Sequence, residues 1–414
     1  MNLPQAFIDY TSALFGPQRW ERFVRAFDEP APISIRLNPF KHQGGALFAQ
    51  QTPVPWCQHA YWLSERPAFT RDPLFHAGVY YVQEAGSCFL DTVLRQHVPA
   101  PVSVLDLCAA PGGKSTLLRA ALPPGSLLVS NEPDRRRANI LLENMLKQGH
   151  PDVLVTHNLP HEFAHTHLAF DVILADVPCS GEGLFRRDEN AVGEWSLPNV
   201  HFCQERQRKI LKDIWPCLRT GGLLIYSTCT FNVHENEENV RWILQELGAE
   251  ILPVSTPAQW NITGSLLSDF DAPVYRFIPG ITRTEGLFMA VLRKTSEGPA
   301  RATLPNSLRE QAKKHRILHI LSDGTCPPDE KGNEKIPSAA QALSIAQPTE
   351  KYPRVELSLD QAQRYLHREA FALPPDTPRG FVLVTYQGYP LGFMKNLGDR
   401  ANNLYPKNWA IKKL

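Results

Sequence analysis

Between residues 102 and 293, short apolar runs alternate with segments whose apolar residues recur at helical spacing. The apolar runs predict strands at 102–107, 126–131, 152–156, 170–175, 222–227 and 285–292. The periodic segments predict helices at 115–122, 134–148, 201–218 and 235–247. This alternation predicts an α/β fold with a doubly wound, mostly parallel sheet and helices on both faces. The last strand follows a long irregular stretch, as is typical of an antiparallel addition.

The pattern changes on both sides of this region. Residues 1 to about 40 predict a helix followed by a half-buried strand at 33–38, where apolar and polar residues alternate. Residues 294 to about 350 are rich in Lys, Arg, Pro and Ser and predict a linker. Beyond the linker, a helix at 359–370 and a hairpin formed by 380–385 and 391–394 predict a small C-terminal domain.

Composition narrows the class of protein without naming a function. The 414 residues are 43% hydrophobic and 21% charged, which describes an ordinary globular protein of two or three domains. No apolar run reaches membrane-spanning length, and the start of the chain does not resemble a signal peptide, so we expect a cytoplasmic protein without a membrane partner. A net charge of +1 means that a nucleic-acid partner would have to be held by local basic patches.

Cysteine and histidine positions argue against a metal centre. The eight cysteines include no C-x-x-C pair, so neither a zinc site nor a disulfide framework is indicated. A histidine group lies at His157, His161, His165 and His167. It has no supporting Cys or Asp set, and a solvated loop is the better interpretation. We therefore expect no metal.

The stretch Val102 to Thr116 (VSVLDLCAAPGGKST) carries the first chemical signal. A strand passes through a glycine turn into a helix, an arrangement that sets backbone N–H groups around a ligand. The turn is not a Walker A loop, because Cys108 stands where the first glycine is required, and it is not the dinucleotide fingerprint. Asp106 followed by small residues suits a cofactor that carries an amino acid group. S-adenosylmethionine fits that description.

Glu132 ends the second predicted strand of this region. It lies roughly 20 residues beyond the glycine turn, where a carboxylate commonly binds a ribose hydroxyl pair. The structural alternative is an acid that caps the following helix, next to Asp134. We favour ribose binding because of the spacing.

Two cysteines follow neighbouring strands of the predicted sheet. Cys179 lies in Asp176-Val177-Pro178-Cys179-Ser180-Gly181, and Cys229 lies in Ser227-Thr228-Cys229-Thr230. A single cysteine after a strand is most often a small core residue. Two at the same sheet edge, each among polar residues, favour chemistry instead. A thiol is mostly protonated at neutral pH, so a nucleophile here would need activation by its neighbours.

These segments together resemble the Sun-type RNA cytosine-5 methyltransferases. The resemblance rests on Cys108 to Lys114, on Asp176 to Gly183 and on Ser227 to Thr230, and it extends to the segments 33–38 and 80–85. The C-terminal Leu391-Gly392-Phe393 and Asn403-Leu404-Tyr405-Pro406 resemble the RNA-binding tail of the bacterial 16S ribosomal RNA branch.

The resemblance implies a role for each matching residue. It makes Cys229 the nucleophile that attacks carbon 6 of the base and Cys179 the cysteine that assists product release. Asp176 would stabilise or protonate ring nitrogen 3. Contacts with S-adenosylmethionine are implied for Cys108, Ala109, Ala110, Pro111, Gly112, Gly113, Lys114, Glu132 and Asp176. Asn158 stands where the family usually has an acid near the adenine, and its side-chain oxygen would replace that acid.

The resemblance also implies a domain plan and partners. It predicts an N-terminal RNA-binding extension (1–85), a Rossmann-like methyltransferase domain (86–295), a linker that begins the C-terminal region (296–349) and a PUA-like RNA-binding domain (350–414). We expect a monomer that acts on RNA, most plausibly 16S ribosomal RNA or the small ribosomal subunit. Arg186 and Arg187, directly after the Cys179 loop, are expected to contact RNA phosphates.

Three other functions compete with this interpretation. A transfer-RNA methyltransferase would use the same chemistry. DNA cytosine methylation is disfavoured, because those enzymes use the cysteine of a Pro-Cys motif and this chain also has Thr228-Cys229. A non-catalytic RNA-binding assembly factor would not require the pair Cys179 and Cys229.

Overall fold

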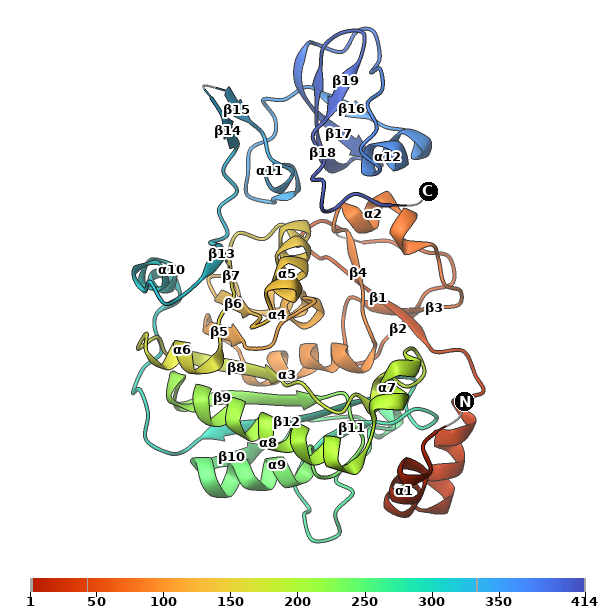
Figure 1. Ribbon diagram of the computed structural model, residues 1–414, viewed down its shortest axis with the longest axis vertical. Coiled ribbons are helices and arrows are strands. Elements are labelled where there is room, and N and C mark those ends of the chain that lie inside the picture. The colour runs from red at the N-terminus through yellow and green to blue at the C-terminus, as the bar shows by residue number, and fades with distance from the viewer. Residues whose placement is uncertain (1–2, 43, 333, 413–414) are drawn as a thin grey trace.

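The computed structural model describes residues 3–42, 44–332 and 334–412 and is built around one large mixed sheet (Figure 1). Its strands are β5 (Ser103–Asp106), β6 (Leu127–Asn131), β7 (Val153–Thr156), β8 (Phe170–Asp176), β9 (Leu218–Thr228), β10 (Ala249–Leu252), β11 (Tyr275–Phe277), β12 (Leu287–Lys294) and β13 (Ile320–Ser322). The order is β10-β12-β9-β8-β5-β6-β7-β13, and β11 also pairs with β12. Strands β5 to β9 are parallel, whereas β12 is antiparallel to β9, as predicted.

Helices cover both faces of this sheet. One face carries α3 (Leu90–His97), α4 (Gly113–Ala121) and α5 (Arg135–Gln148), and the other carries α6 (Pro160–Ala164), α8 (Leu197–Ile214), α9 (Glu237–Trp242) and α10 (Pro305–Lys314). Neighbouring residues of β5 show why the strands are apolar throughout: Val104 packs on the first face and Leu105 on the second. The predicted doubly wound α/β architecture is confirmed. None of the described helices is long and apolar enough to cross a membrane.

Helix α8 begins earlier than its apolar pattern predicted. Its first residue is Leu197 rather than residue 201, because the side chain of Ser196 caps the helix by accepting a hydrogen bond from Asn199 N. Pro198 follows in the first turn, where its missing N–H costs nothing. Ser196 and Pro198 are the residues in the sequence that indicate this earlier helix start.

The segment 296–349 is more than the expected linker. It contains α10, β13, a hairpin of β14 (Asp329–Lys331) and β15 (Glu334–Ile336), and α11 (Ala339–Leu343). Strand β13 extends the main sheet antiparallel to β7, with Ile320 opposite Thr156. Leu308 and Leu318 are buried in the core of the second face. These few apolar residues anchor the segment although its composition is mostly polar.

Two smaller sheets flank this body, one from each end of the chain. The N-terminal part comprises α1 (Gln5–Arg25), β1 (Ile33–Leu37), β2 (Thr52–Pro53), β3 (Ala60–Leu63), α2 (Pro73–His76) and β4 (Tyr80–Val82). The C-terminal part comprises β16 (Arg354–Glu356), α12 (Leu359–Leu366), β17 (Gly380–Tyr386), β18 (Tyr389–Asn396) and β19 (Ala401–Asn403). The predicted hairpin is the antiparallel pair β17 and β18.

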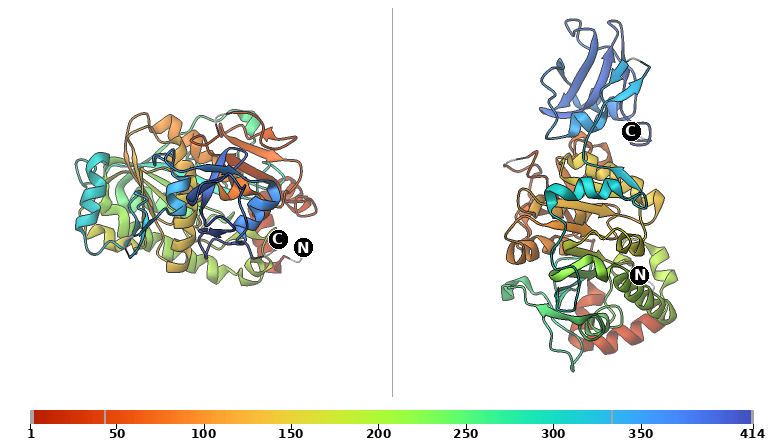
Figure 2. Two further views of the ribbon diagram at one scale, coloured as in Figure 1. Left: turned by 90° about the horizontal axis from the view of Figure 1, so that it is seen from above. Right: turned by 90° about the vertical axis from the view of Figure 1, so that its left-hand side faces the viewer.

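The N-terminal and C-terminal parts share one hydrophobic core. Leu37 and Tyr80 belong to the same buried cluster as Leu366 and Tyr405. The Tyr405 hydroxyl also lies 3.3 Å from Nδ1 of His76. Figure 2 shows the C-terminal sheet at one end of the molecule, and in Figure 1 it lies next to α2. Although composition suggested an independent unit, this domain is packed against the N-terminal one.

The N-terminal part is also locked onto the methyltransferase-like body at the end of α5. The Asn38 side chain donates hydrogen bonds to Gly78 O (2.8 Å) and to Gln148 O (3.0 Å). Gly78 has φ +68, and a Cβ there would lie 1.9 Å from Lys147 O. Only glycine permits the two backbones to approach this closely.

We expect Gly78→Ala to lower the melting temperature much more than Gly388→Ala. Gly388 has a similar positive φ of +78 but open space around it, so its substitution reports the backbone strain alone, about 1–2 kcal/mol. Gly78→Ala adds a backbone clash, for which overpacking costs of about 1–3 kcal/mol are typical. Equal melting temperatures for the two variants, measured by circular dichroism, would contradict the close approach.

Candidate functional site

Four strands deliver the predicted site residues to one edge of the main sheet. Strand β5 ends at Asp106, β8 ends at Asp176, and Glu132 and Cys229 directly follow β6 and β9. These strands are parallel, so their carboxyl ends meet at the same edge. The residues that the sequence separated by more than a hundred positions therefore surround one place.

The glycine turn between β5 and α4 is held by backbone contacts with the end of β6. Ala109 N donates to Asn131 O (2.8 Å), and Ala110 N donates to Glu132 Oε2 (3.2 Å). The Ala110–Pro111 bond is cis, and Gly112 has φ 113 directly before α4. No side chain caps this helix start. Its first amides are therefore left for an anionic group of a ligand.

Asp106 presents a buried oxygen to the same place. The side chain is fully buried, and Oδ2 accepts a hydrogen bond from Ser115 Oγ (2.6 Å), whereas Oδ1 is buried with no partner. Burial raises the pKa of Asp106 to about 7, against the lowering effect of Ser115. An ammonium group would satisfy Oδ1 and favour the ionised carboxylate. Together with the start of α4, these residues fit the amino acid group of S-adenosylmethionine.

Glu132 is buried beside the turn and is not the helix cap. Its Oε1 accepts from Asp134 N (3.1 Å), and its side chain is 4% exposed. The cap of α5 is Asp134, which accepts hydrogen bonds from Arg136 N and Arg137 N. Glu132 is therefore not the acid that caps α5, and its contact with the ribose of the cofactor stays a prediction.

Asn158 lies at the end of β7 and is engaged with the segment that leads to β13. Its Nδ2 donates to Glu162 Oε2 (3.0 Å) and to Ile317 O (2.8 Å), and its Oδ1 accepts from His319 N (3.0 Å). Asn158 as a whole residue is 2% exposed. A hydrogen bond to adenine stays a prediction, and it would have to share Oδ1 with His319.

Lys114 and Asp176 form an ion pair between the glycine turn and the end of β8. Lys114 Nζ lies 2.8 Å from Asp176 Oδ2, and Ser227 Oγ donates to Asp176 Oδ1 (2.7 Å). Burial lowers the pKa of Lys114, but the charge and hydrogen bond of Asp176 outweigh it and the pKa lies above its ordinary value. Both carboxylate oxygens of Asp176 are therefore engaged, one by Lys114 and the other by Ser227.

The two cysteines meet at this edge. Cys179 Sγ lies 3.2 Å from Cys229 Sγ, and both residues are partly exposed. The loops that carry them also touch through Gly183 N, which donates to Cys229 O (2.7 Å). The hydrogen bond with Cys229 and burial raise the pKa of Cys179, and the charges of Cys229 and Glu235 add to this.

A buried polar network fixes these two loops to each other. Glu182, three residues after Cys179, accepts hydrogen bonds from Phe231 N and from Asn232 N (3.0 Å) on the Cys229 side. Glu235, on the Cys229 side, accepts from Ser180 N (3.0 Å) in return. Each loop thus contributes one carboxylate that accepts hydrogen bonds from backbone amides of the other loop.

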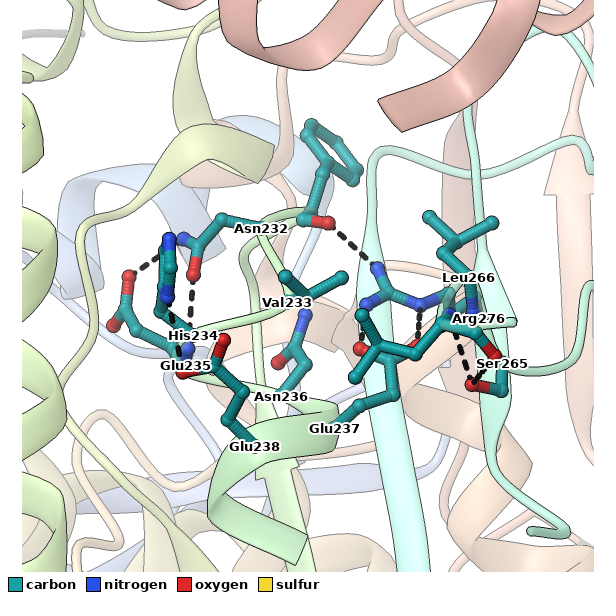
Figure 3. A network of polar contacts seen from close by, with 12 residues as sticks. Asn232, Val233, His234, Glu235, Asn236, Glu237, Glu238, Ser265, Leu266 and Arg276 are labelled. Carbon is teal, nitrogen blue, oxygen red and sulfur yellow. Dashed lines mark hydrogen bonds and ion pairs between the residues drawn. The ribbon is translucent and has the colours of Figure 1, made fainter. Parts of the chain in front are cut away.

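A second layer supports the Cys229 loop from behind (Figure 3). Arg276 of β11 pairs with Glu237 and donates to Phe231 O (2.7 Å), and both charged side chains are almost wholly buried. Asn236 Nδ2 donates to Thr230 O (2.9 Å). Removing one partner of such a buried pair is strongly destabilising, so the loop has little freedom.

The expectation for Arg186 is wrong. Its guanidinium lies 3.1 Å from Glu285 Oε1 and donates to Glu29 O (2.9 Å), and its side chain is 7% exposed. A buried, paired arginine is not available to an RNA phosphate. Arg187 is 44% exposed and only approaches Glu285 at 3.5 Å, so its phosphate contact stays a prediction.

Sequence reasoning missed Glu182 and Glu235 as site residues. Glu182 lay inside the motif that carries Cys179, and Glu235 lies three residues after Asn232, whose Nδ2 donates to it (2.8 Å). Neither residue stood out from an ordinary loop acid, since Arg186 and His234 lie close to them in sequence, so no local signal marked them. Among the described residues, no cluster of three or more His, Cys, Asp or Glu side chains is arranged to hold a metal ion.

Family models match three successive parts of the chain. Residues 96–293 match the 16S rRNA methyltransferase RsmB/F model, residues 3–85 match the N-terminal domain of 16S rRNA methyltransferase RsmF, and residues 352–411 match the methyltransferase RsmF PUA domain.

Two curated relatives extend over nearly the whole chain. One is ribosomal RNA small subunit methyltransferase F from Enterobacter sp. (strain 638), which is 30% identical and covers 94% of this chain and 92% of its own. The protein of the same name from Cronobacter sakazakii is 29% identical and covers 98% of this chain and 96% of its own.

The solved structures give the same fold. A methyltransferase homologue from Pyrococcus horikoshii is 28% identical, with a TM-score of 0.58 over 70% of this chain and 95% of that one. NSun6 from the same organism, solved with SFG, has a TM-score of 0.60 at 19% identity, over 71% of this chain and 99% of that one. The chain belongs to the RsmF family of S-adenosylmethionine-dependent 16S rRNA methyltransferases.

Proposed function

We propose that this enzyme methylates carbon 5 of a cytosine in 16S ribosomal RNA through a covalent adduct with Cys229. The observation that carries the proposal is the 3.2 Å separation of Cys229 Sγ and Cys179 Sγ at the sheet edge where Asp106 and the start of α4 fit the cofactor. Two thiols in contact beside a cofactor site suit a reaction that forms and later breaks a carbon–sulfur bond.

The cofactor is held by the chain's own charges. S-adenosylmethionine supplies an electrophilic methyl group when it is bound. Asp106 Oδ1 would receive its ammonium, the uncapped amides of α4 would receive its carboxylate, and Glu132 would receive its ribose hydroxyls. These contacts orient the methyl group without taking part in bond formation.

Cytosine carbon 5 is too weakly nucleophilic to be methylated unaided. The Cys229 thiolate adds to carbon 6, a carbon–sulfur bond forms, and the electron pair of the carbon 5–carbon 6 double bond makes carbon 5 nucleophilic. After methylation, the carbon 5 proton leaves to water, the double bond forms again, and the carbon–sulfur electron pair returns to Cys229. Cys179 assists this last step.

Asp176 and Lys114 face the developing charge as a pair. Asp176, held by Lys114 and by Ser227, stabilises or protonates ring nitrogen 3 while charge develops there. The target base has to leave its stack to reach this edge, which costs a few kcal/mol in a paired region and less in a single-stranded one.

The substrate and location follow from the family. The relatives are named for the small-subunit ribosomal RNA, and the C-terminal part matches the PUA domain of RsmF, so we assign 16S ribosomal RNA as substrate and the cytoplasm as location. The PUA domain packs against the N-terminal part. Tyr81 of β4 lies beside Gly113, and Arg36 of β1 donates a hydrogen bond to Thr116 Oγ1 (2.6 Å) in the helix after the turn. We expect the enzyme to act as a monomer.

Glu132→Ala is expected to weaken S-adenosylmethionine binding by about 10- to 100-fold. A charged acceptor contributes about 1.5–3 kcal/mol to its hydrogen bonds. Glu132→Gln, which keeps an oxygen for Ala110 N, separates the ribose contact from support of the turn and should lose less affinity. Isothermal titration calorimetry measures both; unchanged affinity in Glu132→Ala would remove the ribose assignment.

The cysteine variants are expected to fail at different steps. Cys229→Ala should neither methylate RNA nor bind it covalently, because the nucleophile is absent. Cys179→Ala should accumulate a protein–RNA adduct that depends on S-adenosylmethionine, because release is slowed after methyl transfer. Denaturing electrophoresis with labelled RNA detects the adduct.

Two outcomes of that experiment contradict the assignment. An adduct from Cys229→Ala but none from Cys179→Ala would make Cys179 the nucleophile. Loss of thermal stability in both variants without any adduct would reduce the two cysteines to packed core residues.

A further inference from the structure

The two thiols differ in the charged groups beside them. The Glu235 carboxylate is bound through Ser180 N (3.0 Å), next to Cys179, and its charge raises the pKa of that thiol, whereas the Lys114 ammonium on the Cys229 side is shared with Asp176 (2.8 Å). A nearby cation favours a thiolate and a nearby anion favours a thiol. The two sulfurs are therefore chemically unequal although they are 3.2 Å apart.

Glu235 is held directly behind Cys179. Its carboxylate accepts hydrogen bonds from Ser180 N (3.0 Å), from Asn232 Nδ2 (2.8 Å) and from Gln207 Nε2 (2.6 Å). Ser180 is the residue after Cys179, so the first of these bonds fixes the carboxylate beside that thiol. Figure 3 shows Glu235 and Asn232 within this network of polar contacts.

Within the described part of the chain, no Lys, Arg or His side chain forms an ion pair with Glu235. Its three hydrogen-bond donors are neutral, its residue is 0% exposed, and the strongest charge acting on it is the acidic Glu182. Burial, with a further contribution from Glu182, raises its pKa to about 7. Gln207 and Asn232 are therefore the groups that keep a buried carboxylate in place without cancelling its charge.

The remaining titratable groups around the pair do not change this asymmetry. Asp176 faces the Cys229 side but is paired with Lys114. Arg208 donates to Asn239 rather than to Glu235. The other titratable neighbours of Glu235 are Cys203 and Tyr226, whose pKa values lie above their ordinary values because of burial and the charge of Glu235.

We propose that Glu235 is a positioning residue that keeps Cys179 as a thiol whose proton points to Cys229. Cys229 is then left as the nucleophile. The inference rests on the proposed cytosine reaction and specifies how Cys179 assists release. As the carbon 6–sulfur bond breaks, its electron pair goes to Cys229 Sγ, Cys179 gives its proton to that sulfur, and water re-protonates Cys179.

Glu235→Gln tests the charge while keeping the shape. The glutamine oxygen can still accept a hydrogen bond from Ser180 N. The hydrogen bond that connects the two loops is therefore retained while the charge is removed. Glu238→Gln is the matched control, because Glu238 lies on the same segment but bonds His234 and Gln204 rather than either cysteine loop residue.

The measurement is the pH dependence of iodoacetamide labelling at each cysteine of the full chain, followed by peptide mass spectrometry at low conversion. In the unchanged protein, Cys229 should label at a lower pH than Cys179. In Glu235→Gln, the labelling midpoint of Cys179 should fall by about one pH unit or more, while Cys229 shifts less. Glu238→Gln should label like the unchanged protein.

A second variant keeps the inference falsifiable if Glu235→Gln does not fold. Lys114→Met should raise the labelling midpoint of Cys229 by about one pH unit and change Cys179 less. The inference is overturned if Cys179 labels before Cys229 in the unchanged protein. It is also overturned if Glu235→Gln folds, as shown by its melting curve, and leaves the Cys179 midpoint in place.

The labelling assay contains neither RNA nor methyl donor. Its result can therefore contradict the role of Glu235 without contradicting the proposed function. An enzyme that methylates another atom of the RNA but shows the predicted labelling order would contradict the cytosine assignment alone. Cytosine methylation with the reverse order would contradict the role of Glu235 alone.

Discussion

The site depends on two buried carboxylates that join the loops after β8 and β9. Glu182 and Glu235 have almost no exposure, and burying a carboxylate is costly unless donors surround it. Here the donors are backbone amides of the opposite loop and the side chains of Asn232 and Gln207. The hydrogen bonds that stabilise these buried carboxylates therefore also hold the two cysteine loops, and with them the two thiols, together.

The rest of the fold supports this junction from several sides. Helix α1 packs against Phe185 and Phe231, which follow the two cysteine loops. Arg276 and Glu237 fix the backbone of Phe231 from the β11 side. Lys114 connects the glycine turn to the end of β8, so the predicted cofactor contacts and the predicted base contact share one ion pair. A shift in any of these elements would be transmitted to the thiols.

The sequence predicted most of the sheet because its strands are buried on both faces and read as apolar runs. It also predicted the convergence of Asp106, Glu132, Asp176 and Cys229, because parallel strands align their carboxyl ends. Strand β13 was not predicted although residues 317–321 are mostly apolar, because the polar composition of 294–350 as a whole favoured a linker. The shared core of the N-terminal and C-terminal parts is a long-range contact without a local pattern.

Side-chain partners were the hardest feature to anticipate. Arg186 next to the Cys179 loop looked free for RNA, but its partner Glu285 is distant in sequence and buries it. Glu235 carried no signal of its own, because its position depends on Ser180, Gln207 and Asn232 from other segments. Local composition therefore indicated which residues carry chemistry, whereas their charges and neighbours required the fold.

The central claim is that the methyl group is placed on carbon 5 of a cytosine. The most direct test is nucleoside mass spectrometry of 16S ribosomal RNA and small subunits after incubation with the purified enzyme and isotopically labelled S-adenosylmethionine. The account predicts labelled 5-methylcytidine, and none when the nucleophile is removed. Label in N4-methylcytidine, or in a base other than cytosine, would contradict it.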